Sequence, residues 1–457
     1  MVALFTRPGG LALEVAALAM LVFLSTTFLA TRPLQHSVSL RFSRAALALT
    51  GSVTGAAALA VLTQVLGLPK VQELEMLLII AATTVIPAAP SGMVRMPGVS
   101  KPRARRVAVV GSDLTASSLD AELRHAGVTR FEVVGRIGPP EDVTNAHPSV
   151  PDLGRLDGLA EILRAQEIDL MLITGDVPEL AVFEELARSC LHLPVRVCQL
   201  ADFYESVFGH VPIAEINAAW FQYIMHPSFR SGESRSKRIL DIVLALSAGL
   251  FFLPLVPIIA LLVASDGGPL LFRQARIGQG GRPFTILKFR TMRHDPASDM
   301  AWASKRDPRV TRVGRLLRLT HLDELPQLLN VLRGDMSIVG PRPEQPAFVD
   351  RLERFVPFYQ RRHLVRPGIT GWAQVRCGYA GSDVGSVWKL CHDLFYLKHR
   401  SASFDLIILV ETLRMLFRDS HRLSQPRSIP FVLSTQAIDA PGAPAAFGSD
   451  GTTTAHG

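Results

Sequence analysis

An Asp-Glu pair followed by a proline, Asp323-Glu-Leu-Pro326, is the part of the sequence best suited to phosphate chemistry. Pro326 is tolerated in a first helical turn, where its missing N–H would have no partner, and Gly334 suits a helix end after Arg333. We therefore expect a helix from about Leu325 to Arg333 with both carboxylates at its start. Unpaired N–H groups and the helix dipole favour anions there, including a bound phosphate.

Asp323 and Glu324 would repel each other if both were ionised. A Mg²⁺ ion bridging one of them to a substrate phosphate would relieve the repulsion and leave the other free as a nucleophile. The alternative is that the pair only caps a helix. The run Val339-Gly-Pro-Arg-Pro-Glu344 favours a site, because two prolines stiffen the backbone around Arg342 and can hold its guanidinium toward a phosphate.

The composition indicates a membrane protein of two or three domains. Of 457 residues, 48% are hydrophobic, and the mean hydropathy is positive. The net charge of +8 suits nucleic acid, anionic lipid or phosphorylated substrates, and the apolar segments favour the last two over nucleic acid. The cysteines have neither metal-like nor disulfide-like spacing, so we expect reduced, structural thiols and a cytoplasmic setting: Cys190, Cys198, Cys377 and Cys391.

Residues 1–95 hold apolar runs at about 11–30, 45–66 and 74–90, which predict about three transmembrane helices. The loop between the first two runs carries three arginines, and five basic residues lie between 95 and 106. By the positive-inside rule, this loop and everything after residue 95 face the cytoplasm, and the N-terminus lies outside.

Residues 104–205 alternate short apolar strands with amphipathic helices, which predicts a parallel α/β sheet resembling a Rossmann-like domain. In the turn Gly111-Ser-Asp-Leu114 an aspartate, Asp113, replaces the glycine that would let a pyrophosphate approach the backbone. A structural or regulatory module is therefore favoured, and dinucleotide binding is the alternative. Residues 138–151 are expected to form a surface loop, and residues 206–235 a linker.

A second membrane element is expected at residues 239–264, an apolar run interrupted by Pro254 and Pro257. Basic residues lie at both of its ends. A helix broken by proline that enters and returns on the cytoplasmic side satisfies this charge distribution, whereas a crossing helix would leave one basic cluster on the wrong side. A kinked spanning helix is the alternative.

Four cations follow within 18 residues, at spacings that could bring them together across a hairpin: Arg273, Arg276, Lys288 and Arg290. A solvated charged face is the ordinary explanation of such a run.

Together these motifs resemble the bacterial sugar transferases, the monotopic polyprenyl-phosphate glycosyl-1-phosphate transferases that start exopolysaccharide and related glycan assembly. The resemblance covers about residues 236–417, and the N-terminal spans and middle domain resemble the large members of the family. It rests on Lys237-Arg238 with Asp241, the helix broken by proline, Phe272–Gly278, Lys288–Met292, Asp323–Gln327, Asn330–Ser337, Val339–Glu344 and Arg366–Gln374.

The resemblance implies a membrane protein of α plus α/β class: N-terminal spans, a Rossmann-like domain and a monotopic catalytic domain at 236–420. It implies Mg²⁺-dependent transfer of a sugar 1-phosphate from a nucleoside diphosphate sugar, usually UDP-linked, to undecaprenyl phosphate in the bacterial cytoplasmic membrane. Carried over, Asp323 is the nucleophile and Glu324 the Mg²⁺ ligand. Pro254 breaks the re-entrant helix, and the contacts to diphosphate and nucleotide come from Arg273, Arg276, Lys288, Arg290 and Arg342.

Two positions depart from the family pattern. Leu253 stands where members often carry serine before the helix-breaking proline, and His392-Asp393 replaces the usual Tyr-Asp pair. We expect His392 to be a surface histidine. The C-terminal part has an apolar helix at about 404–417, too short to span, and a disordered tail at 434–457.

Two other functions compete with the transferase. One is a non-catalytic membrane scaffold or nucleotide-sugar sensor of a glycan assembly complex; the other is a membrane-tethered NAD-dependent oxidoreductase, which Asp113 disfavours. The intact Asp323-Glu324 pair and the Arg342 loop favour the enzyme. The sugar, the oligomeric state and contacts with other polysaccharide assembly proteins stay open.

Overall fold

The computed structural model describes residues 103–138, 150–216, 220, 235–265, 267–293, 309–377 and 383–416, apart from positions 176, 178 and 191. The expected N-terminal spans, residues 139–149 of the expected loop, most of the expected linker and the C-terminal tail lie outside these ranges. All statements below concern the described residues.

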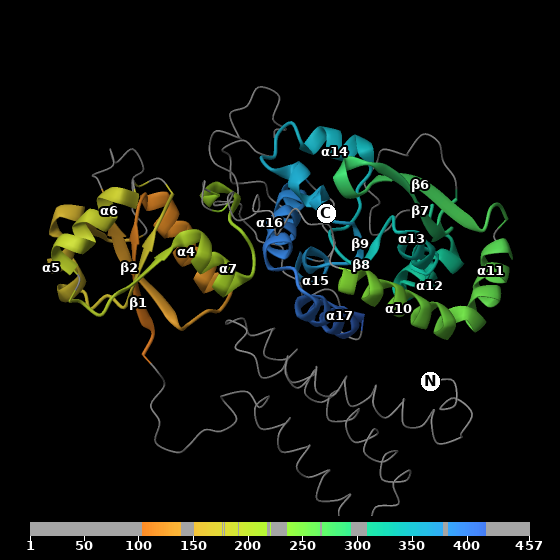
Figure 1. Cartoon of the computed structure of the whole chain (residues 1–457), viewed down its shortest axis with the longest axis horizontal. Coiled ribbons are helices and arrows are strands. Elements are labelled where there is room, and N and C mark those ends of the chain that lie inside the picture. Colours follow the sequence, from red (N-terminus) through yellow and green to blue (C-terminus); the bar gives the residue numbers. More distant parts are fainter. Residues whose placement is uncertain are drawn as a thin grey trace, which may run out of the picture. The chain divides into compact units, whose positions relative to one another are not determined.

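The middle domain is built on a five-stranded sheet in the order β3-β2-β1-β4-β5 (Figure 1). Every pair in it is parallel, which confirms the predicted parallel α/β sheet. The strands are β1 (Arg105–Val110), β2 (Phe131–Ile137), β3 (Asp152–Gly154), β4 (Leu170–Ile173) and β5 (Arg196–Gln199).

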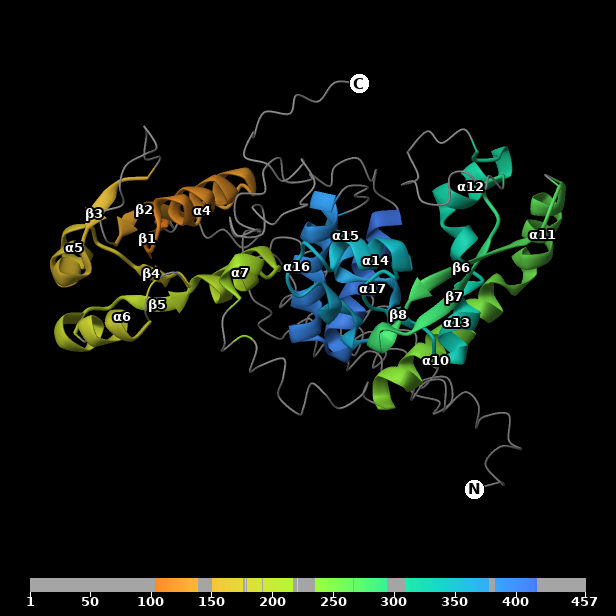
Figure 2. The same ribbon diagram turned by 90° about the horizontal axis from the view of Figure 1, so that it is seen from above.

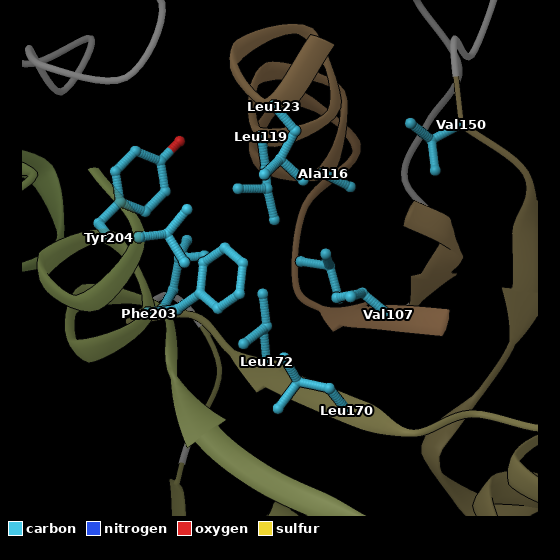
Figure 3. Packing of buried hydrophobic residues seen from close by; sticks show 12 residues of the cluster. Val107, Ala116, Leu119, Leu123, Val150, Leu170, Leu172, Phe203 and Tyr204 are labelled. Atoms are coloured by element: carbon cyan, nitrogen blue, oxygen red, sulfur yellow. The ribbon is translucent and has the colours of Figure 1, made fainter. Parts of the chain in front are cut away.

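Helices cover both faces of this sheet, because alternate residues of each strand point to opposite sides. Val107 and Val109 pack with α4 (Asp113–His125) and α7 (Leu200–Phe208), as Figure 3 shows for Leu119, Phe203 and Tyr204. The intervening Ala108 and Val110 pack with α5 (Leu159–Ala165) and α6 (Glu179–Glu185) on the other face.

At the carboxyl edge of the sheet, side chains of the same chain accept hydrogen bonds from backbone N–H groups. Ser112 caps α4 by accepting a hydrogen bond from the Thr115 N–H at 3.3 Å. At the end of the neighbouring strand β4, the Gly175 N–H donates to Glu215 Oε2 at 2.7 Å. Glu215 belongs to a 3₁₀ turn, η4 (Ile213–Glu215), so a carboxylate of the connecting segment occupies an anion-accepting position at this edge.

Helix α7 runs through the expected domain boundary at residue 205, and its far side contacts the C-terminal region. Glu205 accepts hydrogen bonds from Lys398 Nζ and His399 Nε2, both at 2.8 Å. After the helix ends, Trp372 Nε1 donates to Gly209 O at 2.7 Å. The middle and C-terminal regions are therefore joined by direct contacts as well as by the chain.

The apolar run after residue 235 forms two helices joined at Pro254. Helix α10 (Arg235–Phe252) is followed by a 3₁₀ turn, η5 (Leu253–Leu255), and then by α11 (Val256–Ser265). Figure 1 shows α11 turning away from the line of α10. Together they are the one described helical segment long and apolar enough to cross a membrane, and most of its side chains are exposed. The 3₁₀ turn lies at Pro254, where the sequence predicts a break.

The C-terminal region also contains an antiparallel β-hairpin of β6 (Leu271–Ile277) and β7 (Pro283–Phe289). Phe289 packs with Ile259 and Val263 of α11 and with Leu317 of α12 (Arg312–Thr320), and Figure 2 shows α11 and α12 at this end of the hairpin. The remaining elements are the 3₁₀ turn η8 (Leu322–Glu324), α13 (Gln327–Arg333), β8 (Ser337–Val339), α14 (Pro346–Leu352), η9 (Tyr359–Leu364), β9 (Gly368–Thr370), α15 (Trp372–Cys377), α16 (Asp383–His399) and α17 (Ala402–Leu416).

Candidate active site

The Asp323-Glu324 pair lies in a tight turn between two helices. Thr311 caps α12 through its hydroxyl, and the helix ends at Thr320, followed by His321, whose φ of 57° lies in the left-handed region. A non-glycine residue in this region is uncommon and turns the chain sharply. The chain then forms η8 with both carboxylates, and α13 begins after Pro326, two residues later than expected from the sequence. Helix α13 ends at Arg333 with left-handed Gly334, as predicted.

Glu324 is held by two cations from different parts of the chain. Lys288 Nζ donates to Glu324 Oε1 at 2.7 Å, and Arg342 Nη2 donates to the same oxygen at 3.2 Å. Burial opposes ionisation of Glu324, but the charges of Arg342 and Lys288 outweigh it and lower its pKa to about 2. Glu324 is therefore a fixed, weakly basic carboxylate.

Asp323 is also buried, but its environment is different. Among the described residues, no hydrogen bond reaches its carboxylate. Burial raises its pKa, and the nearby charge of Lys288 only partly opposes this effect. Because basicity and nucleophilicity rise together for similar oxygen atoms, Asp323 is the more nucleophilic of the two carboxylates once it is ionised.

The hairpin brings only part of the predicted cation cluster to this pair. Phe272 lies opposite Lys288 and Arg276 lies opposite Phe284, so Arg276 and Lys288 share one face of the two strands. Arg273 lies opposite Leu287 and belongs to the other face, where it is exposed. The structure therefore does not bring Arg273 together with Arg276 and Lys288.

Arg290 lies beyond the end of β7 and is used to hold a helix end. Its Nη2 donates to Val263 O at 3.0 Å, and its Nε donates to Pro269 O at 2.9 Å. Val263 O is among the last four carbonyls of α11, which have no partner within the helix. Arg290 thus caps α11 and does not contact Glu324.

Arg276 adds a third cation beside Arg342. It donates through Nη1 to Pro343 O at 3.1 Å and through Nη2 to Gln274 Oε1 at 2.6 Å, while its buried Nε has no hydrogen-bond partner. Burial, together with the charge of Arg342, lowers the pKa of Arg276 to about 10. Few carboxylates lie near the three cations Arg276, Arg342 and Lys288. The local excess of positive charge suits the binding of an added anion such as a diphosphate.

The loop at 339–344 is held from outside along most of its backbone. Lys237 Nζ and Tyr396 OH donate to Val339 O, and the Gly368 N–H donates to Pro341 O. The next three carbonyls accept from Arg362, from Arg276 and from the N–H of Ile277. The two prolines predict a rigid loop. Hydrogen-bond donors from distant parts of the sequence also hold its backbone in place.

Asn330 joins the helix that follows the carboxylates to the strand that carries Lys288. Its side chain is fully buried, and its Oδ1 accepts from the Leu287 N–H at 3.1 Å. Its Nδ2 donates to Thr285 O at 2.8 Å and to Asp335 Oδ2 at 3.2 Å. Because these bonds fix β7 on either side of Ile286, they also fix the position of Lys288.

The start of α10 is attached to the same helix and to β8. Arg238 donates to Val331 O at 2.6 Å and to Leu332 O at 2.9 Å, which satisfies carbonyls at the end of α13. Asp241 Oδ1 accepts from Ser337 Oγ at 2.9 Å and from the Ile338 N–H at 3.0 Å. These bonds attach α10 to β8 and to α13, the helix that follows the turn carrying Asp323 and Glu324.

The structure corrects the expectation that His392 is a surface residue. His392 is 5% exposed, its ring lies 5.3 Å from the ring of His210, and its Nδ1 donates to Trp388 O at 2.9 Å. Burial lowers its pKa to about 4, so the imidazole is neutral near pH 7. A helical histidine with apolar neighbours can face either way, and the fold places this face of α16 inward.

Sequence reasoning missed several residues that support the site, above all Asn330, Tyr359 and Arg362. Asn330 lies inside a quoted motif without an assigned role. Arg362 stands among other basic residues, and nothing in its spacing distinguishes a buried arginine from an exposed one. A helical period around Asn330 could have indicated that its amide is buried.

Comparison with known proteins gives a consistent result. Residues 232–419 match the family described as "Bacterial sugar transferase". Over 270 residues, the chain is 47% identical to the UDP-N-acetylgalactosamine-undecaprenyl-phosphate N-acetylgalactosaminephosphotransferase of Aeromonas hydrophila, an alignment covering 58% of this chain and 60% of that relative.

Two further relatives bear the name UDP-glucose:undecaprenyl-phosphate glucose-1-phosphate transferase. The protein from Caulobacter vibrioides is 46% identical over 184 residues, which cover 39% of this chain and 69% of the relative. The protein from Escherichia coli is 34% identical over 330 residues, which cover 70% of this chain and 69% of the relative. The chain thus spans about three fifths to seven tenths of the length of these curated relatives.

Proposed function

The chain belongs to the bacterial sugar transferase family, and from this premise we propose that it transfers a sugar 1-phosphate from a nucleoside diphosphate sugar to undecaprenyl phosphate. The names of its relatives support this reaction class, with a UDP-linked donor in each of the relatives described above. The product would initiate an exopolysaccharide or a related glycan, and a relative in Rhizobium leguminosarum is named as an exopolysaccharide production protein.

The observation that carries this proposal is the difference between the two adjacent carboxylates. Glu324 is bound by Lys288 and Arg342, whereas no hydrogen bond among the described residues engages Asp323, whose pKa is raised by burial. A nucleophile must be uncommitted and sufficiently basic, and a group that binds or neutralises charge must be fixed. This difference supports Asp323 as nucleophile and Glu324 as an electrostatic partner.

In the proposed first step, a carboxylate oxygen of Asp323 attacks the phosphorus that bears the sugar. The bond from this phosphorus to the oxygen of the nucleoside monophosphate breaks, and the monophosphate leaves with the electron pair. An oxygen of undecaprenyl phosphate then attacks the same phosphorus and displaces the Asp323 carboxylate. Dividing the transfer in this way replaces one difficult step with two easier ones.

We assign the diphosphate to the face of the hairpin that carries Arg276 and Lys288, next to Arg342. Arg342 is 43% exposed, so its guanidinium can meet a ligand arriving from solvent, and the partly exposed Arg276 donates to the carbonyl of the next residue, Pro343. Charge developing on the leaving phosphate is stabilised by fixed cations of this type. We propose Arg273 and Arg290 only for more distant roles, because neither side chain lies with this group.

The donor set suits Mg²⁺. Both hydrogen bonds to Glu324 use Oε1, so no hydrogen bond from the described residues engages Oε2. In the described part of the chain, no group of three or more acidic, histidine or cysteine side chains could form a complete cage. Mg²⁺ is commonly held by one or two carboxylates together with substrate phosphates, so we propose Glu324 as its protein ligand. When bound, the ion supplies Lewis-acid stabilisation of phosphoryl charge.

We infer that α10 and α11 enter the cytoplasmic face of the bacterial inner membrane and return to it. The exposed apolar side chains on both helices support a lipid environment, for example Leu250, Phe251 and Leu261 at 74–76% exposure. The break at Pro254 and the basic residues at both ends support re-entry over crossing. The carboxylate turn, attached to α10 through Arg238 and α13, would then meet the lipid phosphate near the interface.

We propose three functional parts for the whole chain. They are transmembrane helices in residues 1–95, a Rossmann-like domain at 104–205 and a catalytic domain at 236–420, joined by a linker at 206–235. At the carboxyl edge of its sheet Glu215 accepts the hydrogen bond of the Gly175 N–H, which supports a structural or regulatory role for the middle domain.

The test uses the full chain in nanodiscs with Mg²⁺, undecaprenyl phosphate and a panel of UDP-sugars, with UMP release and lipid-linked sugar as readouts. We expect one UDP-sugar to give both products. Without the lipid, a burst of about one UMP per enzyme is expected from a covalent intermediate. Absence of UMP with every sugar would refute the transferase and favour the scaffold, and wild-type turnover by Asp323→Asn would refute Asp323 as nucleophile.

A further inference from the structure

Arg362 is a buried arginine that the proposed reaction does not use directly. It lies in η9 with 1% of its side-chain surface exposed. Its Nη2 donates to Arg342 O at 3.0 Å, and its Nη1 donates to Tyr359 OH at 2.7 Å. The guanidinium therefore reaches the backbone of the residue whose side chain contacts Glu324.

Two carboxylates compensate the charge of Arg362. Its Nη1 lies 2.8 Å from Glu344 Oε1, and its Nη2 lies 2.8 Å from Asp393 Oδ2. Tyr359 OH donates to the other oxygen of Glu344. Breaking such a buried group by removing one partner is strongly destabilising, although apolar residues can often replace the whole group without loss. Because apolar residues could often replace this group without loss of stability, packing alone does not explain why charged side chains hold Glu344, the last residue of the loop.

The cluster connects two distant segments to the loop at 339–344. Glu344 ends this loop, Tyr359 and Arg362 belong to η9, and Asp393 belongs to α16. The bond from Arg362 to Arg342 O fixes the peptide from one side, while Arg276 fixes the next carbonyl from the side of the hairpin. With its main chain fixed in this way, Arg342 needs to order only its own side chain to reach Glu324 at 3.2 Å.

We propose that Arg362 is a positioning residue that sets the distance between the Arg342 guanidinium and the carboxylate pair by holding the Arg342 carbonyl. Its activity readout rests on the transferase function proposed above. Lysine at position 362 would keep the positive charge but could not reach the Arg342 carbonyl, Glu344 and Asp393 together, because it lacks the planar fork of donors. A displacement of about 1 Å near reacting groups can lower a rate by about 10²-fold.

The experiment is a double-mutant cycle between Arg362→Lys and Arg342→Ala in the full chain. Alone, Arg362→Lys should lower kcat/KM for the UDP-sugar by about 10- to 100-fold. In the Arg342→Ala background, where no guanidinium is left to position, the same change should lower it by less than about 3-fold. Equal losses in the two backgrounds would overturn the proposal, because a merely structural role would act regardless of Arg342.

The matched control is Arg136→Lys, which changes another buried arginine paired with an aspartate, Asp152 at 3.0 Å, in the middle domain. It should leave kcat/KM unchanged. A second readout independent of activity is amide hydrogen exchange at residues 340–345, which should accelerate in Arg362→Lys and stay unchanged in Arg136→Lys. Unchanged exchange in Arg362→Lys would also overturn the proposal, whereas loss of UMP release in the wild type would refute only the transferase.

If Arg362→Lys does not fold, Tyr359→Phe carries the same test, because it removes only the hydroxyl shared by Arg362 and Glu344. A smaller loss of kcat/KM, about 3- to 10-fold, is then expected, and it should again disappear in the Arg342→Ala background. An equal loss in both backgrounds would count against positioning.

Discussion

Lys288 Nζ lies 2.7 Å from Glu324 Oε1, across 36 residues of sequence. Arg342 and Lys288 together lower the pKa of Glu324 to about 2, whereas burial raises the pKa of the neighbouring Asp323. The hairpin that carries Lys288 and the turn that carries Glu324 are joined a second time by Asn330. The contact between Lys288 and Glu324 therefore depends on the relative position of β7 and α13.

The first prediction concerns the pH dependence of the transfer reaction. Burial raises the pKa of Asp323, and the positive charge of Lys288 opposes this effect. Asp323 must be ionised to attack, so the rate falls when the pH falls through its pKa. Replacing Lys288 with methionine should raise this pKa further and move the acid limb of kcat/KM to higher pH. The exposed control Arg124→Met should keep the wild-type profile, and an unshifted limb in Lys288→Met would contradict the assignment.

The second prediction concerns stability. The folded-state pKa of Glu324 is lowered to about 2 from an ordinary value of 4.5. Its ionised form therefore stabilises the fold above pH 4.5, and this contribution is lost as the pH falls from 4.5 toward 2. The contribution is on the order of 3 kcal/mol. The difference in unfolding free energy between wild type and Glu324→Gln should shrink over this window, and a difference independent of pH would contradict it.

The third prediction concerns Asn330. Alanine at this position would leave the Leu287 N–H and Thr285 O buried without their partner. Each unsatisfied group costs about 1–3 kcal/mol, so thermal unfolding should occur several degrees lower. Because Lys288 would lose its support, kcat/KM should fall as well. Asp335→Asn, which keeps an oxygen acceptor for Asn330 Nδ2, is the control and should be milder in both measurements.

The fourth prediction concerns membrane topology. If α10 and α11 form a re-entrant element, Ser236→Cys and Ser265→Cys should both react with an impermeant thiol reagent from the cytoplasmic side of inverted vesicles. Adding Pro254→Ala should favour a straighter helix and reduce labelling at position 265. The buried native thiols of Cys377 and Cys391 should remain unlabelled, because burial raises their pKa. Opposite exposure of positions 236 and 265 before the proline is changed would contradict re-entry.

Local patterns in the sequence predict most of the elements. Alternating apolar strands and amphipathic helices predict the parallel sheet, and the proline in the apolar run predicts the break between α10 and α11. Pro326 and Gly334 predict the helix after the carboxylates, with its start displaced by two residues because a 3₁₀ turn precedes it. These features follow from backbone chemistry that acts within a few residues.

The sequence also predicts which residue types form the site, but it does not predict which role each residue has. The motif contains both carboxylates and Arg342, yet spacing alone allows four hairpin cations to converge. Strand alternation separates Arg273 from Arg276 and Lys288, and the end of α11 binds Arg290. His392 shows the same limit, because a polar residue on a helix is buried or exposed according to what packs on that face.

By itself, the sequence determines which residue types are available for phosphate chemistry, where the chain must turn or break, and which family the chain belongs to. The tertiary structure alone decides that Glu324 receives two cations, that Asp323 receives no hydrogen bond from the described residues, and that Arg362 is buried behind Arg342. The physical reason is that pKa values and nucleophilicity depend on burial and on charges a few ångströms away. Those charges come from residues 18 to 36 positions apart in the sequence, whose proximity only the packed fold creates.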